Sequence, residues 1–169
     1  MAKLLLRALE PKDLDFLFEI ENDRDLWHLS HTQQPFSAHL LRQYIAQADE
    51  DIYSAKQFRF AIVQKNDQQL VGFIDLFDFD PKNKRAGIGI VIHQKYRQKG
   101  YGRIALELLI DYAFNILYLH QLYANIAANN LPSLQLFESM GFKLAGIKKD
   151  WNFNGRSFED ELLYQLFND

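Results

Sequence analysis

The feature that most constrains this chain is a short apolar run that ends in a basic, glycine-bearing loop, which in turn opens a long apolar segment. Residues 86–93 are strand-like, and the loop reads Lys95-Tyr96-Arg97-Gln98-Lys99-Gly100-Tyr101-Gly102-Arg103. Residues 104–117 are apolar apart from a polar stripe at every fourth position, which predicts a helix buried on most of its surface. A strand, a loop and a buried helix in this order indicate a mixed α/β fold.

The loop has the chemistry of an anion-binding site. Free N–H groups and the helix dipole attract negative charge to a helix N-terminus. Gly100 and Gly102 let the backbone approach a phosphate closely, and Arg97, Lys99 and Arg103 add positive charge. The alternative is a glycine-containing helix start with solvated cations. The pattern matches neither a dinucleotide-binding GxGxxG motif nor a Walker loop.

Composition excludes several classes of protein. The chain has 169 residues, of which 48% are apolar and 24% charged, and this suits one sizeable globular core. Because there is no cysteine, thiol catalysis, disulfide scaffolds and cysteine-based metal sites are ruled out. The formal charge of −3 gives no broad basic surface for nucleic acid. No apolar stretch approaches the roughly 18 residues of a transmembrane helix, and the first residues make a poor signal peptide, so we expect a cytoplasmic protein without a membrane partner.

The remaining pattern predicts further elements around this unit. Strands are expected at residues 4–9, 58–64, 70–79 and 122–128, with a terminal pair at about 142–147 and 161–167. Helices are expected after Pro11, after the N-cap candidate Ser37 and around Pro132, the last ending at Gly141. The order β-α-α-β-β-β-α-β-α-β-β predicts one domain over residues 1–169.

A second motif follows the strand expected at residues 122–128. It reads Asn129-Asn130-Leu131-Pro132-Ser133-Leu134-Gln135-Leu136-Phe137-Glu138-Ser139-Met140-Gly141-Phe142. Together with the loop, in this order and separation, it resembles the GNAT superfamily of acyl-coenzyme A-dependent N-acyltransferases. The tail from Trp151 to Tyr164 resembles the branch that contains the ribosomal-protein N-terminal acetyltransferases and spermidine N-acetyltransferase.

The resemblance implies a single-domain fold with a mixed, mostly antiparallel sheet, flanking helices and splayed central strands. Those strands would be residues 88–93 and 122–128, with the pantetheine arm of acetyl-CoA between them. Backbone groups around Val91 and Ile92 would hold the arm and polarise the thioester carbonyl. Asn130 would bind the arm, although a helix-cap role explains it as well. The residues that would hold the pyrophosphate are Arg97, Gln98, Lys99, Gly100, Tyr101, Gly102 and Arg103.

The implied activity is acetyl transfer from acetyl-CoA to a primary amine by direct attack, without a metal. The acceptor would be a protein N-terminus, a polyamine or another small-molecule amine. A non-catalytic acyl-CoA-binding sensor or scaffold is the alternative, because Phe137 stands where many relatives have a tyrosine general acid. Relatives are often dimers, and a terminal strand such as residues 161–167 could pair with a second copy, which makes a homodimer one expectation.

Two residues are candidates for catalysis. Asp75 shares one strand face with Phe73 and Phe77 and is the candidate general base, acting through a water; a structural, hydrogen-bonded acid is the alternative. Ser133 lies at the start of the last helix, where it would stabilise the leaving thiolate by a hydrogen bond and the helix dipole. Its alternative is an ordinary helix-start serine.

The resemblance assigns residues 22–36 to the acceptor pocket. Trp27, His28 and His31 are therefore candidate substrate residues, with ordinary surface side chains as the alternative. Phe73 and Phe77, with Trp27, would line the acceptor groove. The two histidines present no third ligand for a metal. Where spermidine enzymes carry extra carboxylates, this chain reads Ser30-His31-Thr32-Gln33-Gln34, which puts a polyamine acceptor in doubt.

Overall fold

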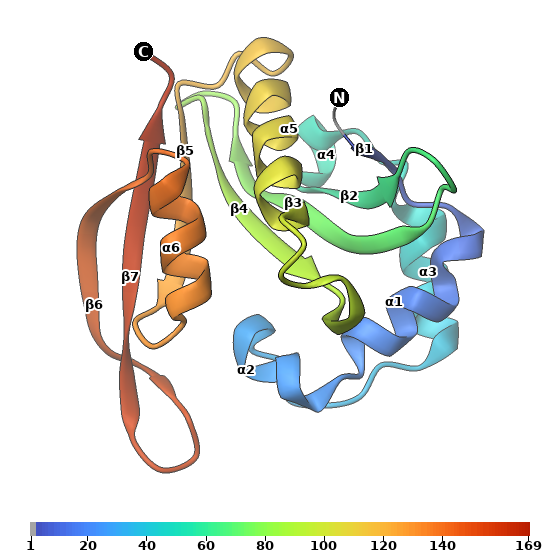
Figure 1. Ribbon diagram of the computed structural model, residues 1–169, viewed down its shortest axis with the longest axis horizontal. Coiled ribbons are helices and arrows are strands. Elements are labelled where there is room, and N and C mark those ends of the chain that lie inside the picture. Colours follow the sequence, from blue (N-terminus) through green and yellow to red (C-terminus); the bar gives the residue numbers. More distant parts are fainter. Residues whose placement is uncertain (1–2) are drawn as a thin grey trace.

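The computed structural model describes residues 3–169 and contains a seven-stranded sheet (Figure 1). The strand order is β1-β2-β3-β4-β5-β7-β6, and neighbouring strands are antiparallel except β4 and β5. The predicted mixed, mostly antiparallel α/β fold is confirmed. The strands are β1 (Leu4–Ala8), β2 (Phe58–Gln64), β3 (Leu70–Asp80), β4 (Arg85–Ile92), β5 (Gln121–Ala127), β6 (Lys143–Phe153) and β7 (Phe158–Phe167).

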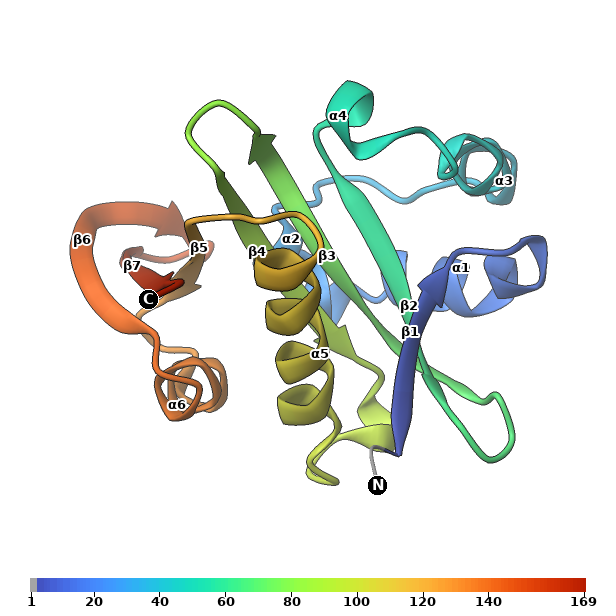
Figure 2. The same cartoon turned by 90° about the horizontal axis from the view of Figure 1, so that it is seen from above.

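Helices cover both faces of the sheet, with α5 and α6 on one side and α1 and α3 on the other (Figure 2). The one-turn helices α2 and α4 were not predicted, because a single turn is too short to show helical periodicity. No helix among residues 3–169 is long and apolar enough to cross a membrane. The helices are α1 (Leu14–Glu21), α2 (Trp27–Ser30), α3 (Ala38–Gln47), α4 (Ile52–Ala55), α5 (Tyr101–Asn115) and α6 (Leu131–Ser139), with 3-10 turns η1 (Pro11–Asp13), η2 (Arg24–Leu26) and η3 (Gln94–Tyr96).

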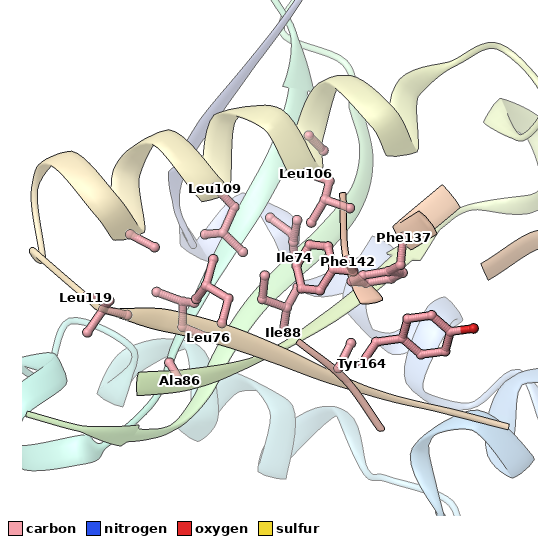
Figure 3. Close-up of a cluster of buried hydrophobic side chains, with 14 of the residues drawn as sticks. Ile74, Leu76, Ala86, Ile88, Leu106, Leu109, Leu119, Phe137, Phe142 and Tyr164 are labelled. Atoms are coloured by element: carbon pink, nitrogen blue, oxygen red, sulfur yellow. The ribbon is translucent and has the colours of Figure 1, made fainter. Parts of the chain in front are cut away.

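The larger core fills the space between the sheet and α5. Leu106 and Leu109 of α5 face Ile74 and Leu76 of β3, while Phe137 closes one end of the cluster (Figure 3). These side chains are almost completely removed from solvent, so their burial fixes α5 firmly over the centre of the sheet. The N-terminal end of α5, which comes after β4 in the chain, is thereby held close to the middle strands of the sheet.

A second core lies under α1 and α3, and it corrects one expectation. Phe73 is 1% exposed and packs with Leu17 and Leu41, so its predicted place in the acceptor groove is wrong. Phe73 shares a strand face with Asp75, as alternation requires. It lies nearer to α1, however, where Phe16 meets its ring edge-on at a centroid distance of 5.7 Å.

The C-terminal hairpin is longer than predicted and arranged differently. β6 and β7 extend to a tight turn at Asn154 and Gly155, whose φ of +94° is left-handed. β7 lies between β5 and β6, so both of its edges are paired. The expectation that residues 161–167 could pair with a second copy is therefore wrong, and the edge strand at this side of the sheet is β6.

Candidate active site

β4 and β5 are paired only where they begin. Their register joins residues 85–87 to residues 121–123 and ends there, after which the strands separate (Figure 1). The splayed central strands predicted from the resemblance are confirmed. A cavity of about 430 Å³ opens in the gap, and residues 88–91 and 124–127 form part of its walls.

Backbone groups that face this gap follow from the alternation of the sheet. The N–H of His93 donates to the carbonyl of Val71 at 2.9 Å, so the odd-numbered residues of β4 bond to β3. The N–H and C=O groups of Ile90 and Ile92 therefore face the gap. Those of Val91 bond to β3, so of the two residues predicted to hold the arm through their backbone, Ile92 alone presents these groups to it.

The basic loop connects the end of β4 to the start of α5. Gln98 and Gly100 both adopt left-handed backbone conformations, with φ of +60° and +78°. Gly100 is the N-cap of α5 and has no side chain to occupy the N–H groups of the first turn. Arg97 is anchored by its Nε, which donates to the carbonyl of Ile92 at 3.0 Å. The loop thus presents free N–H groups beside fixed positive charge.

The other loop residues contribute in different ways. The Tyr101 hydroxyl donates to Gln64 of β2 at 2.8 Å, so its side chain points away from the loop and only its backbone is available there. Lys99 and Arg103 are exposed. A Cβ at Gly102 would lie 3.4 Å from a leucine side chain of α6, so this position packs closely against α6.

His93, which the sequence analysis missed, holds the start of the loop. It is 9% exposed, and its Nδ1 accepts from the N–H of Lys95 at 3.2 Å. Its Nε2 therefore carries the proton and donates to Glu19 of α1 at 2.8 Å. The hydrogen bond from His93 holds the pKa of Glu19 below its usual value. His93 thereby links α1 to the start of the loop, and this link restricts the loop's conformation.

The start of α6 forms another part of the cavity wall. The side chain of Asn130 accepts from the N–H of Ser133 at 3.3 Å, so its helix-cap role is real, and both residues also line the cavity. Phe137, one turn further on, lines it too and is 2% exposed. No tyrosine is among the described residues that line the cavity.

Asp75 lies at the other end of the cavity, in a cluster with Arg59 and Glu21. Arg59 donates from Nε and Nη2 to the two oxygens of Asp75 at 2.8 and 3.0 Å, and from Nη1 to Glu21 at 2.7 Å. The rings of Tyr44 and Phe73 lie 5.7 and 5.6 Å from its guanidinium carbon. Burial is the largest single influence and lowers the pKa of Arg59. The attraction of Asp75, its hydrogen bonds and the charge of Glu21, with a contribution from Tyr44, together outweigh burial and raise the pKa, so the cation persists.

The alternative to a general base is that Asp75 is a structural, hydrogen-bonded acid, and Arg59 would be its partner in that role. A carboxylate has about four lone-pair positions, and Arg59 takes one on each oxygen. Asp75 therefore keeps positions for a water or an ammonium group. It lines the cavity, and its Oδ2 would lie 3.8 Å from a Cβ at Gly89 of β4.

The three candidate residues expected to shape the acceptor pocket fall into two groups. His28 and His31 line the cavity and are exposed, whereas Trp27 does not line it. The Trp27 indole N–H donates to the carbonyl of Glu21 at 2.9 Å, which ties η2 and α2 to α1. Residues 3–169 hold no group of three or more metal-ligating side chains.

Opposite the Arg59 cluster, β6 and β7 supply a second ion pair. Glu161 is 6% exposed and lines the cavity, and Lys148 donates to it at 3.2 Å. Lys148 also donates to Asn125 of β5 at 3.0 Å, and it lies 5.0 Å from the Trp151 ring. One wall of the cavity therefore carries Arg59 with two carboxylates, and the other carries Glu161, which Lys148 pairs from outside the lining.

A comparison with known families decides the assignment. The family model described as "Acetyltransferase (GNAT) domain" matches residues 3–143. The chain belongs to this GNAT acetyltransferase family. It is an enzyme that transfers an acetyl group from acetyl-CoA to an amine.

Individual relatives of this acetyltransferase cover nearly its whole length. The spermidine N(1)-acetyltransferase of Vibrio cholerae is 28% identical over 166 residues, 98% of this chain and 94% of that protein. The crystal structure of the Vibrio cholerae enzyme with CoA and spermine has a TM-score of 0.89 at 25% identity, over 99% of this chain and 96% of that one. A structure of the same enzyme described as dodecameric has a TM-score of 0.82 at 26% identity, over 99% and 95%.

The acetyltransferase has the donor set that coenzyme A requires. A pyrophosphate needs N–H donors and positive charge, which the loop and the first turn of α5 supply. The amide groups of a pantetheine arm need a strand edge, which Ile90 and Ile92 offer on one side of the gap and Asn125 on the other. The fit rests on backbone atoms more than on side chains.

Sequence reasoning missed several charged residues of the acetyltransferase, and the reasons differ. Arg59 was within reach: counting back from the turn at residues 65–69 places it opposite Asp75, as the register confirms. Counting back from the turn at Asn154 would pair Lys148 with residue 163. A register shift between residues 148 and 152 moves its partner to Glu161 instead, and the sequence carries no clear signal for that shift.

Proposed function

We propose that this acetyltransferase carries out the transfer in the cavity between β4 and β5, with a small-molecule primary amine as the acceptor. The supporting observation is that the strand edges of the gap and the Glu21–Arg59–Asp75 cluster line the same cavity of about 430 Å³. An acetyl group placed along the strand edges would meet an amine held near Asp75. A volume of this size suits a small molecule.

On the cofactor side, the proposed roles fall to the loop and β4. The N–H groups of the loop and of the first turn of α5 bind the pyrophosphate, and Arg97, Lys99 and Arg103 add charge. The N–H of Ile92 faces the gap and is available to the thioester carbonyl as negative charge develops on its oxygen. Because acetyl-CoA is a cytoplasmic metabolite, we place the protein in the cytoplasm.

On the acceptor side, Asp75 takes the proton of the incoming ammonium group through a water. The neutral amine then attacks the carbonyl carbon, so that a C–N bond forms as the C–S bond breaks. The sulfur leaves as a thiolate and takes up the second proton, which the nitrogen releases as it becomes an amide. Ser133 donates a hydrogen bond to that sulfur from the first turn of α6. His28 and His31 contact the acceptor on the α2 side of the cavity.

An assay of thiol release with acetyl-CoA and a panel of amines and peptides tests the proposal. We expect Asp75→Asn to lower kcat about a hundredfold with little change in the KM for acetyl-CoA. Asp78→Asn, an exposed carboxylate on the same strand, is the matched control and should leave kcat unchanged. An Asp75→Asn enzyme that loses thermal stability but keeps its kcat would show that Asp75 is purely structural. Preference for peptide N-termini over small amines would contradict the acceptor class.

We also propose that the enzyme self-associates through β6. This free edge strand exposes four large apolar side chains, at Leu144, Ile147, Trp151 and Phe153. The dodecameric description of the Vibrio cholerae structure supports association in a relative. Light scattering should give a multiple of the chain mass for the wild type and a smaller mass for Ile147→Lys. An unchanged mass in that variant would exclude this edge.

A further inference from the structure

The charged groups at the acceptor end of the cavity are already paired with one another. Three carboxylates line it, those of Glu21, Asp75 and Glu161, and each is hydrogen-bonded to a cation. Arg59 serves the first two and Lys148 serves the third. Three negative charges against two positive charges leave one negative charge for the acceptor.

From this balance we propose that the acceptor is a monoamine: a primary amine with one positive charge and an uncharged, largely apolar body, rather than a polyamine. The inference rests on the proposed function and narrows it. One ammonium group satisfies the remaining negative charge. A second or third ammonium group on the same molecule would lie near Arg59 or Lys148 without a free carboxylate to balance it.

The position of Arg59 makes this pairing hard to rearrange. Three of its N–H donors are engaged, and the rings of Tyr44 and Phe73 flank the guanidinium group. Releasing Glu21 to a polycation would require the guanidinium group to turn out of this setting. A flexible lysine could give way more easily than this planar, bidentate group.

The wall contributed by the N-terminal segments points to the same acceptor class. In these segments the lining residues after Glu21 include no carboxylate, and two of them are apolar. Phe77 of β3 adds an aromatic surface. An apolar body is therefore matched by apolar side chains close to the amine. These lining residues are Leu26, His28, Leu29, Ser30 and His31, with Ile20 of α1 beside them.

Matched acceptors test the inference directly. Hexylamine and 1,6-diaminohexane have the same carbon chain and differ only in the second ammonium group. We expect kcat/KM with acetyl-CoA to favour hexylamine by about tenfold or more at low ionic strength, with spermidine poorer still. Equal or better use of the diamine or of spermidine would overturn the proposal.

Binding measurements test the preference for a monoamine separately from acetyl transfer. Calorimetry with the CoA-bound enzyme measures the same preference without turnover. Tighter binding of hexylamine than of diaminohexane supports the inference even if no amine is acetylated, an outcome that would contradict the proposed function instead. Tighter binding of the diamine overturns the inference whatever the turnover.

A variant that removes the positive charge of Lys148 tests whether charge balance causes the preference for a monoamine. Lys148→Gln leaves Glu161 without a cation, so the diamine should gain about fivefold relative to the monoamine. Lys148→Arg keeps the charge and should keep the wild-type ratio, which controls for altered packing. Lys149→Gln, whose lysine pairs with Asp160 and is 77% exposed, should also keep it. A ratio unaffected by Lys148→Gln would overturn the proposal.

Discussion

The two ends of the cavity are built from different parts of the polypeptide. At the cofactor end, the groups offered to a ligand are mostly backbone: the free edges of β4 and β5 and the N–H groups around Gly100. At the acceptor end they are side chains, brought together from α1, β2, β3, β6 and β7 around Arg59 and Glu161. The first end depends on where the chain runs, and the second on which residues it carries.

This difference predicts opposite sensitivities to mutation. A backbone site tolerates many side-chain changes and fails when the backbone conformation changes. A site made of ion pairs fails when one charge is removed or when a bidentate contact is broken. Single substitutions at the two ends of the cavity test this contrast.

Gly100→Glu should abolish most coenzyme A binding. The variant forces a left-handed backbone on a residue with a Cβ and places a negative charge at the anion site. We expect affinity to fall about a thousandfold, measured by calorimetry. Gly155→Glu is the matched control, because Gly155 is also left-handed, with open space around it, but lies at the tip of the β6–β7 turn. An equal loss of affinity in both variants would contradict a local effect.

Arg59→Lys keeps the positive charge at the acceptor end but loses the bidentate contact with Asp75. Because Asp75 would no longer be held in one orientation, we expect kcat/KM for the amine to fall roughly thirtyfold. Affinity for coenzyme A should stay within about twofold, since the cofactor end makes no use of this side chain. Parallel kinetics and calorimetry provide the measurement. Equal losses at both ends would refute the division between them.

Ser133→Ala should lower kcat about tenfold if this hydroxyl stabilises the departing thiolate. Adding Phe137→Tyr restores a hydroxyl one turn away on the same cavity wall, so most of the loss should be recovered in the double variant. Single-turnover rates are the measurement. A wild-type rate for Ser133→Ala would leave the serine as a helix-start residue only.

The His93 contact should have the smallest effect, because it acts on the loop indirectly. His93→Ala removes the cap of η3 and the contact with α1, so we expect the KM for acetyl-CoA to rise about fivefold with kcat unchanged. Equal changes in KM and kcat would argue for a direct role.

The pH dependence of stability tests the same contact. Since the pKa of Glu19 is lowered in the folded protein, the contact stabilises the fold above the ordinary glutamate value of about 4.3 and is lost as the pH falls below it. The melting temperatures of wild type and Glu19→Gln should therefore differ at neutral pH and converge in acid.

How much the sequence could predict follows the same division. The cofactor end is encoded locally: the loop and Asn130 to Phe142 occupy two short stretches, and both signatures led to the correct fold and to its splayed strands. The acceptor end is assembled from residues as distant as Glu21 and Glu161. Their meeting depends on strand registers and on the shift in β6, which no local pattern specifies.

The error at Phe73 has a related cause. Alternation along β3 correctly placed Phe73, Asp75 and Phe77 on one face. That face, however, passes from beneath α1 at one end to the cavity at the other, and position along the strand decides which environment each side chain meets. Periodicity reports the face of a strand and carries no information about what covers each part of it.

The short seam between β4 and β5 also has a mechanical consequence. Three residue pairs join the strands β1–β4 to the strands β5–β7. A cofactor bound in the gap would join the strands β1–β4 to the strands β5–β7 through hydrogen bonds that the sheet itself lacks there. Amide hydrogens next to the paired residues of β4 and β5 should therefore exchange more slowly once the cofactor binds. The whole enzyme should become more rigid around a molecule that it releases in every turnover.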